Sequence, residues 1–122
     1  MERDDRPWGY YQVVDEGRSF RVKRLCVRAG QRISYQRHTS RAEHWYLVAG
    51  SGVATIDGTD LQVEAGSTVD VPIGAAHRIA NTGEDELVLV EVQTGSYFGE
   101  DDIERLSDDY GRPAVADPPS PG

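Results

Sequence analysis

The sequence contains a single cysteine, Cys26, among its 122 residues. One thiol cannot form a disulfide within the chain, and it cannot supply a zinc site built from several thiolates. Its place in a run of apolar and β-branched residues is typical of a small buried side chain.

Long apolar runs and an excess of positive charge are also missing. No stretch of about 18 apolar residues occurs, so we expect neither a transmembrane helix nor a signal peptide, and a cytoplasmic protein. Lys and Arg number 13 against 21 Asp and Glu, which gives a net charge of −8. An acidic exterior argues against nucleic acids and anionic membranes as partners.

The acidic residues are concentrated near the end of the chain. Residues 84–122 hold 2 basic and 11 acidic side chains, whereas residues 1–83 hold 11 basic and 10 acidic ones. A few arginines aimed into a pocket can set the local field there, so a small anionic substrate remains compatible with the overall charge.

Short β-rich segments separated by glycine turns make up most of the chain. This rhythm favours an all-β fold of antiparallel strands, with Asp57 and Gly58 forming a tight hairpin. The expected strands are residues 20–28, 43–48, 52–57, 67–71 and 86–93.

The C-terminal part of the sequence does not show this strand pattern. Residues 100–109 predict a short helix, because three acidic side chains occupy its first turn and Gly111 follows its end. Residues 113–122 are rich in proline and poor in apolar side chains, so we expect a disordered tail. One domain, residues 1–112, precedes that tail.

Two clusters of polar residues occur about forty positions apart at strand spacing. Side chains two positions apart in a strand share a face, so Gln36 and His38 point the same way. If these residues and the corresponding faces at Glu43 and His77 line a barrel, two imidazole nitrogens and two oxygens converge on a cation. Such ligands suit one divalent ion, Zn²⁺, Mn²⁺, Fe²⁺, Co²⁺ or Ni²⁺, and their identity alone does not choose among these metals. We take Zn²⁺ as the first expectation.

The spacing of these clusters resembles the two motifs of the cupin superfamily. The first cluster sets Gln36, His38 and Glu43 between two glycines, and the second sets His77 after a proline and a glycine. The resemblance implies a double-stranded β-helix, or jelly-roll barrel, and assigns Gln36, His38, Glu43 and His77 as the metal ligands.

Glutamine in place of the usual cupin histidine at Gln36 points to the phosphomannose isomerases. The chain is similar to the cupin domain that ends the type II enzymes, where it usually follows a mannose-1-phosphate nucleotidyltransferase domain. The similarity covers residues 6–112. Its matching stretches are residues 6–9, 20–24, 41–45, 91–95, 97–103 and 108–112.

This resemblance implies a metal-dependent aldose-ketose isomerase that interconverts mannose 6-phosphate and fructose 6-phosphate through an enediol. The metal would polarise the sugar carbonyl, and a base would move a proton between two carbons. Lys23 and Glu91 are the candidate bases, because alternation places each on an apolar strand face where burial would shift its pKa toward neutrality.

A phosphate group requires cationic donors. Arg41 is the best candidate, since it lies between two expected metal ligands. The full set of candidates for binding a sugar phosphate is Arg41, Arg21, Arg78 and Arg105.

Two other functions remain open. The chain could be a non-catalytic, metal-containing cupin that binds or senses a small sugar-like ligand. It could also be an iron-dependent oxygenase, although Gln36 weakens this reading because oxygen-activating cupins usually have a third histidine there. By analogy with similar barrels, we expect a homodimer formed through sheet edges, with the apolar strand at residues 20–28 as a candidate edge.

Overall fold

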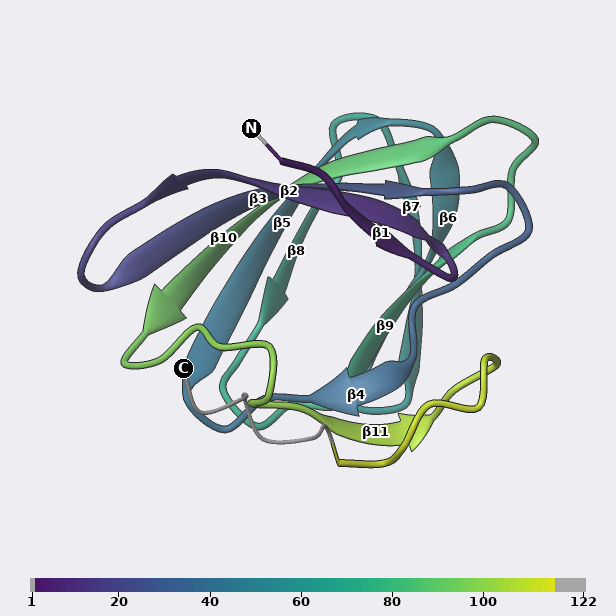
Figure 1. Cartoon of the computed structure of the whole chain (residues 1–122). Coiled ribbons are helices and arrows are strands. Elements are labelled where there is room, and N and C mark those ends of the chain that lie inside the picture. Colours follow the sequence, from purple (N-terminus) through teal and green to yellow (C-terminus); the bar gives the residue numbers. More distant parts are fainter. Residues whose placement is uncertain (1, 116–122) are drawn as a thin grey trace.

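The computed structural model describes residues 2–115, and within that range its regular structure consists of β-strands alone (Figure 1). Two antiparallel sheets face each other, which confirms the predicted all-β cupin barrel. The first sheet runs in the order β1 (Asp4–Arg6), β2 (Gly9–Glu16), β3 (Phe20–Val27), β10 (Leu87–Gly95), β5 (Arg41–Ala49) and β8 (Thr68–Val71). The second runs in the order β11 (Glu104–Ser107), β4 (Tyr35–Arg37), β9 (His77–Asn81), β6 (Ser51–Ile56) and β7 (Thr59–Glu64).

Each of the five predicted strands corresponds to an observed one, namely β3, β5, β6, β8 and β10. The tight hairpin is also confirmed, because Ile56 pairs with Thr59 across the turn that joins β6 to β7. Asp57 and Gly58 both have positive φ there, of 46° and 79°. Two consecutive residues in this conformation give a turn whose twist matches that of the flanking strands.

Side chains alternate between core and surface along β10, where Leu87, Leu89, Glu91 and Gln93 are buried. Register divides the barrel interior into two halves. Leu89 lies opposite Leu25 of β3 and Leu47 of β5, whereas Glu91, two residues later, lies opposite Lys23 and Trp45. The interior is therefore apolar at one end and polar at the other.

The apolar half forms one continuous core. Its buried members come from both sheets, so burying them joins the two layers. They are Trp8, Tyr11, Leu25, Val27, Ile33, Trp45, Leu47, Ala54, Val63, Val69, Val71, Ala75, Ile79, Leu87 and Leu89.

The predicted helix at residues 100–109 is wrong. The segment crosses from β10 to the second sheet, where β11 pairs with β4. Its acidic side chains have partners far away in sequence. Glu100 forms an ion pair with Lys23, and the Asp102 carboxylate accepts hydrogen bonds from the backbone N–H groups of Thr39 and Ser40. These tertiary contacts outweigh a weak local preference for helix.

Two other expectations depend on the chain ends and edges. Residues 116–122 of the predicted tail lie outside the described residues, while Ala114 accepts a hydrogen bond from the Arg105 backbone at 2.6 Å. The strand at residues 20–28 is flanked by β2 and β10 and is not a free edge, so the homodimer stays a prediction. No helix able to cross a membrane occurs within residues 2–115.

Candidate functional site

A cavity of about 220 Å³ opens at the polar end of the barrel. The first sheet contributes Lys23 from β3, Glu43 from β5 and Glu91 from β10, and the second contributes Gln36 from β4 and Arg105 from β11. The segment that joins β10 to β11 lines another side. The cavity thus collects polar side chains from strands that are far apart in sequence.

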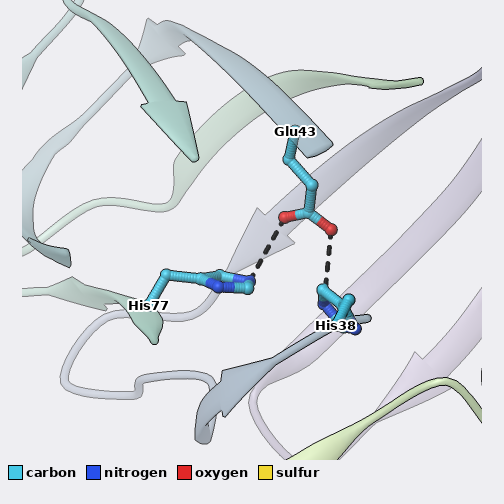
Figure 2. A group of neighbouring side chains, drawn as sticks. All are labelled: His38, Glu43 and His77. Carbon is cyan, nitrogen blue, oxygen red and sulfur yellow. Dashed lines mark ion pairs between the residues drawn. The ribbon is translucent and has the colours of Figure 1, made fainter. Parts of the chain in front are cut away.

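His38, Glu43 and His77 converge beside this cavity, which His38 and Glu43 line (Figure 2). Each offers one ligand atom, and these atoms all lie within 4.8 Å of one another. The two carboxylate oxygens of Glu43 each face one ring: Oε2 lies 3.3 Å from His38 Nε2, and Oε1 lies 3.3 Å from His77 Nε2. All three side chains are buried. The structure thus brings together three of the four predicted ligands.

Both rings are oriented by backbone carbonyls behind them. His38 Nδ1 lies 2.5 Å from the Asp102 carbonyl, and His77 Nδ1 lies 3.0 Å from the Ala75 carbonyl. A carbonyl only accepts hydrogen bonds, so each Nδ1 carries the proton and each Nε2 presents a lone pair toward Glu43. This is the tautomer found in metal-bound histidines.

The charge states of the group also suit a metal. Burial lowers the pKa of His38 to about 4, which keeps the ring neutral at pH 7. Burial alone would raise the pKa of Glu43, but contacts with His77 and Glu91 hold it well below its usual range. His77 Nε2 is buried and makes no hydrogen bond. A neutral His38 ring, the Glu43 carboxylate and the unpartnered buried nitrogen of His77 fit a divalent cation.

Gln36, the fourth predicted ligand, lines the cavity but has a hydrogen-bond partner of its own. Its backbone pairs with that of His77, which brings β4 beside β9. The side chain lines the cavity, but its Oε1 accepts a hydrogen bond from Ser34 Oγ at 2.7 Å. The amide oxygen is therefore near the group of His38, Glu43 and His77 but already has a partner.

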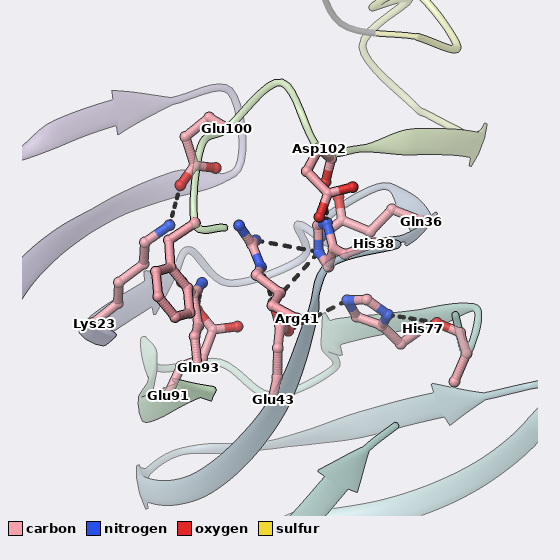
Figure 3. Close-up of polar contacts among 12 residues, drawn as sticks. Lys23, Gln36, His38, Arg41, Glu43, His77, Glu91, Gln93, Glu100 and Asp102 are labelled. Atoms are coloured by element: carbon pink, nitrogen blue, oxygen red, sulfur yellow. Dashed lines mark hydrogen bonds and ion pairs between the residues drawn. The ribbon is translucent and has the colours of Figure 1, made fainter. Parts of the chain in front are cut away.

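Arg41 reaches into this group from the start of β5 (Figure 3). Its Nε donates to Glu43 Oε2 at 3.1 Å, and its NH2 lies 3.2 Å from His38 Nε2. Its NH1 is buried and has no hydrogen-bond partner. Of the four arginines predicted to bind phosphate, Arg41 lies deepest, with 4% of its surface exposed.

The two candidate bases, Lys23 and Glu91, lie opposite each other on the paired strands β3 and β10, at one side of a buried polar network (Figure 3). Trp45 Nε1 lies 3.3 Å from Glu43 Oε1 and 3.2 Å from Glu91 Oε1, so the indole N–H is shared between two carboxyl groups. Burial, and next to it the charge of Glu43, raise the pKa of Glu91 well above its usual value. Lys23 is paired with Glu100 and lies 4.3 Å from the centre of the Tyr11 ring.

The remaining predicted arginines separate into two groups. Arg105 lines the cavity. Arg21 instead donates to Glu16 and to the Phe98 carbonyl, and Arg78 donates to the carbonyls of Ile33 and Ser107. Neither Arg21 nor Arg78 is among the cavity residues.

Four residues near the site were not identified from the sequence. Arg6 and Arg112 line the cavity beside Arg105, and Glu100 also lines it. Asp102 holds the His38 ring through its carbonyl. Arg6 and Arg112 lie in stretches that carried the family resemblance, which was the only available signal. The acidic pair was assigned to a helix, which concealed its role.

Solved structures with the same fold come from several organisms. The capsular polysaccharide assembling protein CapF of Staphylococcus aureus superposes with a TM-score of 0.76 at 18% identity, over 87% of this chain and 34% of that one. The cupin domain of Cnp3 of Schizosaccharomyces pombe gives 0.67 at 17% identity, over 70% and 64%. These likenesses establish a cupin fold and nothing further.

Sequence relatives are closer. The alginate biosynthesis protein AlgA of Pseudomonas aeruginosa is 49% identical over 109 residues, 89% of this chain. The mannose-1-phosphate guanylyltransferase of Salmonella montevideo is 47% identical, and the xanthan biosynthesis protein XanB of Xanthomonas campestris is 46% identical, each over 88% of this chain. This chain spans 23% of the length of each of these three relatives.

These names correct the predicted activity. The relatives are named for guanylyl transfer and polysaccharide biosynthesis, so the prediction of a stand-alone, metal-dependent aldose-ketose isomerase is wrong. The predicted activity depended on the family resemblance alone, and that resemblance identifies the domain and not its reaction. The family itself is secure: the sequence model described as "Mannose-6-phosphate isomerase C-terminal" matches residues 2–108. The chain belongs to this family of cupin domains.

Proposed function

We propose that the cavity binds a mannose phosphate as part of the mannose-1-phosphate guanylyltransferase system for which its relatives are named. In this proposal the chain serves polysaccharide precursor synthesis in the cytoplasm and acts as a ligand-binding domain. A divalent metal, zinc first, is held by His38, Glu43 and His77.

The observation that carries the proposal is a set of arginines that line the cavity and interact electrostatically with one another. Arg6, Arg105 and Arg112 all line it. Arg105 has a buried Nε without a hydrogen-bond partner, and its NH1 donates only to the Pro113 carbonyl. Burial, and after it the charges of Arg112 and Arg6, lower the pKa of Arg105. Clustered cations with unused donors are suited to a phosphate group.

Other lining residues, Glu43 and Glu91 among them, could contact the sugar. When bound, a divalent cation would hold hydroxyl or carbonyl oxygens of the ligand as a Lewis acid. Trp45 Nε1 fixes the carboxyl groups of Glu43 and Glu91, and Gln93 Nε2 donates to Glu91 at 3.0 Å. Glu91, with its raised pKa, can keep its proton and donate it to a sugar oxygen.

Isothermal titration calorimetry with mannose 6-phosphate, mannose 1-phosphate and unphosphorylated mannose tests this function. Binding should require the phosphate, and Arg105→Gln should weaken it about tenfold to a hundredfold, the range for losing hydrogen bonds to a charged group. Arg24→Gln is the matched control, because Arg24 is exposed on β3 and does not line the cavity.

Equal binding of mannose and its phosphates would refute the proposal. So would an Arg105→Gln variant that binds as tightly as the wild-type protein. Metal content is measured on the same samples by elemental analysis, with His77→Gln as the variant expected to lose the ion.

A further inference from the structure

The metal-ligand group already has a cation in contact with it, the guanidinium of Arg41. Arg41 Nε donates to Glu43 Oε2, and NH2 lies close to His38 Nε2. An arginine keeps its charge at any pH a folded protein survives, and burial does not alter this here, because Glu43, Glu91 and Glu100 hold the pKa of Arg41 above its usual value against burial. The side chain therefore neutralises Glu43 inside the barrel.

The contact with His38 is the informative one. His38 Nδ1 carries the proton and donates a hydrogen bond to the Asp102 carbonyl. Nε2 is therefore the acceptor of the hydrogen bond from Arg41. A neutral imidazole nitrogen has one lone pair. That lone pair can accept a proton from Arg41 or coordinate a metal ion, but it cannot do both.

Glu43 is less exclusive, because each carboxylate oxygen has more than one acceptor site. Arg41 can therefore stay on Oε2 of Glu43 while a metal uses the other oxygen, which faces His77. A guanidinium beside a divalent ion would still repel it in a buried, weakly screened site. The single lone pair of His38 Nε2 and this charge repulsion therefore both favour a movement of Arg41 away from His38 when a metal binds.

We propose that Arg41 is an internal competitor for the metal: its guanidinium contacts His38 and Glu43 and must leave His38 for a divalent cation to bind there. This inference rests on the metal-binding part of the proposed function. It predicts that metal affinity is lower than the three ligands alone would give, and that removing the guanidinium raises it.

The test compares Zn²⁺ affinity in the wild-type protein, Arg41→Met and Arg105→Met, by competition with a chromophoric chelator at pH 7.5. Methionine keeps most of the length of arginine but has neither its charge nor its donors. Arg41→Met should bind Zn²⁺ at least tenfold more tightly than the wild type. Arg105→Met removes another cavity cation that does not touch the three ligands, and it should change the affinity less than threefold.

A second measurement uses the wild-type chain, so that the result does not depend on a variant with an unpaired Glu43. In ¹H–¹⁵N spectra of the arginine Nε–H groups, the Arg41 signal should shift when Zn²⁺ is added, while that of Arg105 stays in place. Zinc binding that is unchanged or weaker in Arg41→Met, together with an unmoved Arg41 signal, would overturn the inference. Absence of zinc binding in every form would instead reject the metal in the proposed function.

Discussion

His38 is surrounded so completely that burial lowers its pKa to about 4, against about 6.5 for an unfolded chain. Between these values the unfolded state binds the proton more readily. The contribution of His38 to stability is therefore complete above pH 6.5 and is lost as the pH falls toward 4. The difference corresponds to about 3 kcal/mol of unfolding free energy.

Urea unfolding in EDTA, at steps from pH 7.5 to pH 4.5, measures this loss. Glu91 acts in the opposite direction, because its raised pKa means that the folded state takes up a proton first as the pH falls. The informative quantity is thus the difference in unfolding free energy between the wild-type protein and His38→Gln. This difference should become smaller as the pH falls. Parallel pH profiles for the two proteins would show that His38 does not titrate as described.

The same residues show what sequence patterns can and cannot provide at this scale. His38, Glu43 and His77 were brought together correctly, because strand periodicity fixes which side chains face inward. Gln36 was given the same status, and its role as a ligand stays a prediction: its Oε1 accepts a hydrogen bond from Ser34 and keeps a second lone pair. Periodicity fixes the face of a side chain but not its partner.

At the scale of a strand, Gly95 ends β10 where that strand passes the start of β5. It has φ of +156°, and an added Cβ would lie 2.1 Å from the Ser40 carbonyl oxygen and 2.9 Å from the Arg41 Cα. Gly95→Ala should therefore cost more than about 2 kcal/mol of unfolding free energy, since backbone must move.

Gly30→Ala is the matched control for this substitution. Gly30 has φ of +76° but no atom within 4 Å of the position of a Cβ. Its cost should be limited to backbone strain, about 1 kcal/mol. Urea titration compares the two, and equal losses would mean that the close approach to Ser40 relaxes without penalty.

Strands were easier to predict than the segment that follows them. The five strands recognised in the sequence have strong β-branched or aromatic content, whereas β4 and β11 have only three and four residues. The pairing of β11 with β4 depends on a crossing between sheets that local patterns do not contain. Acidic residues at 100–102 satisfy helix rules equally well, so the wrong element was predicted there.

For the molecule as a whole, the homodimer expected from its resemblance stays a prediction with a simple measurement. Light scattering coupled to size exclusion should give twice the chain mass of 13.5 kDa. The strand first considered as an edge is internal, and β1 and β8 are the outer strands of its sheet. A mass of one chain at every concentration would contradict the dimer.

The crossing between β10 and β11 decides when the cavity can become complete. Glu100 meets Lys23, the carbonyl of Asp102 orients His38, and Arg105 follows in β11. A ribosome must release Asp102 before the His38 ring can be oriented by its carbonyl. A nascent chain ending near Gly95 would already contain every described strand except β11 and would still lack the groups that complete the pocket. Proteolysis within this crossing would separate those groups from the strands that carry the metal ligands.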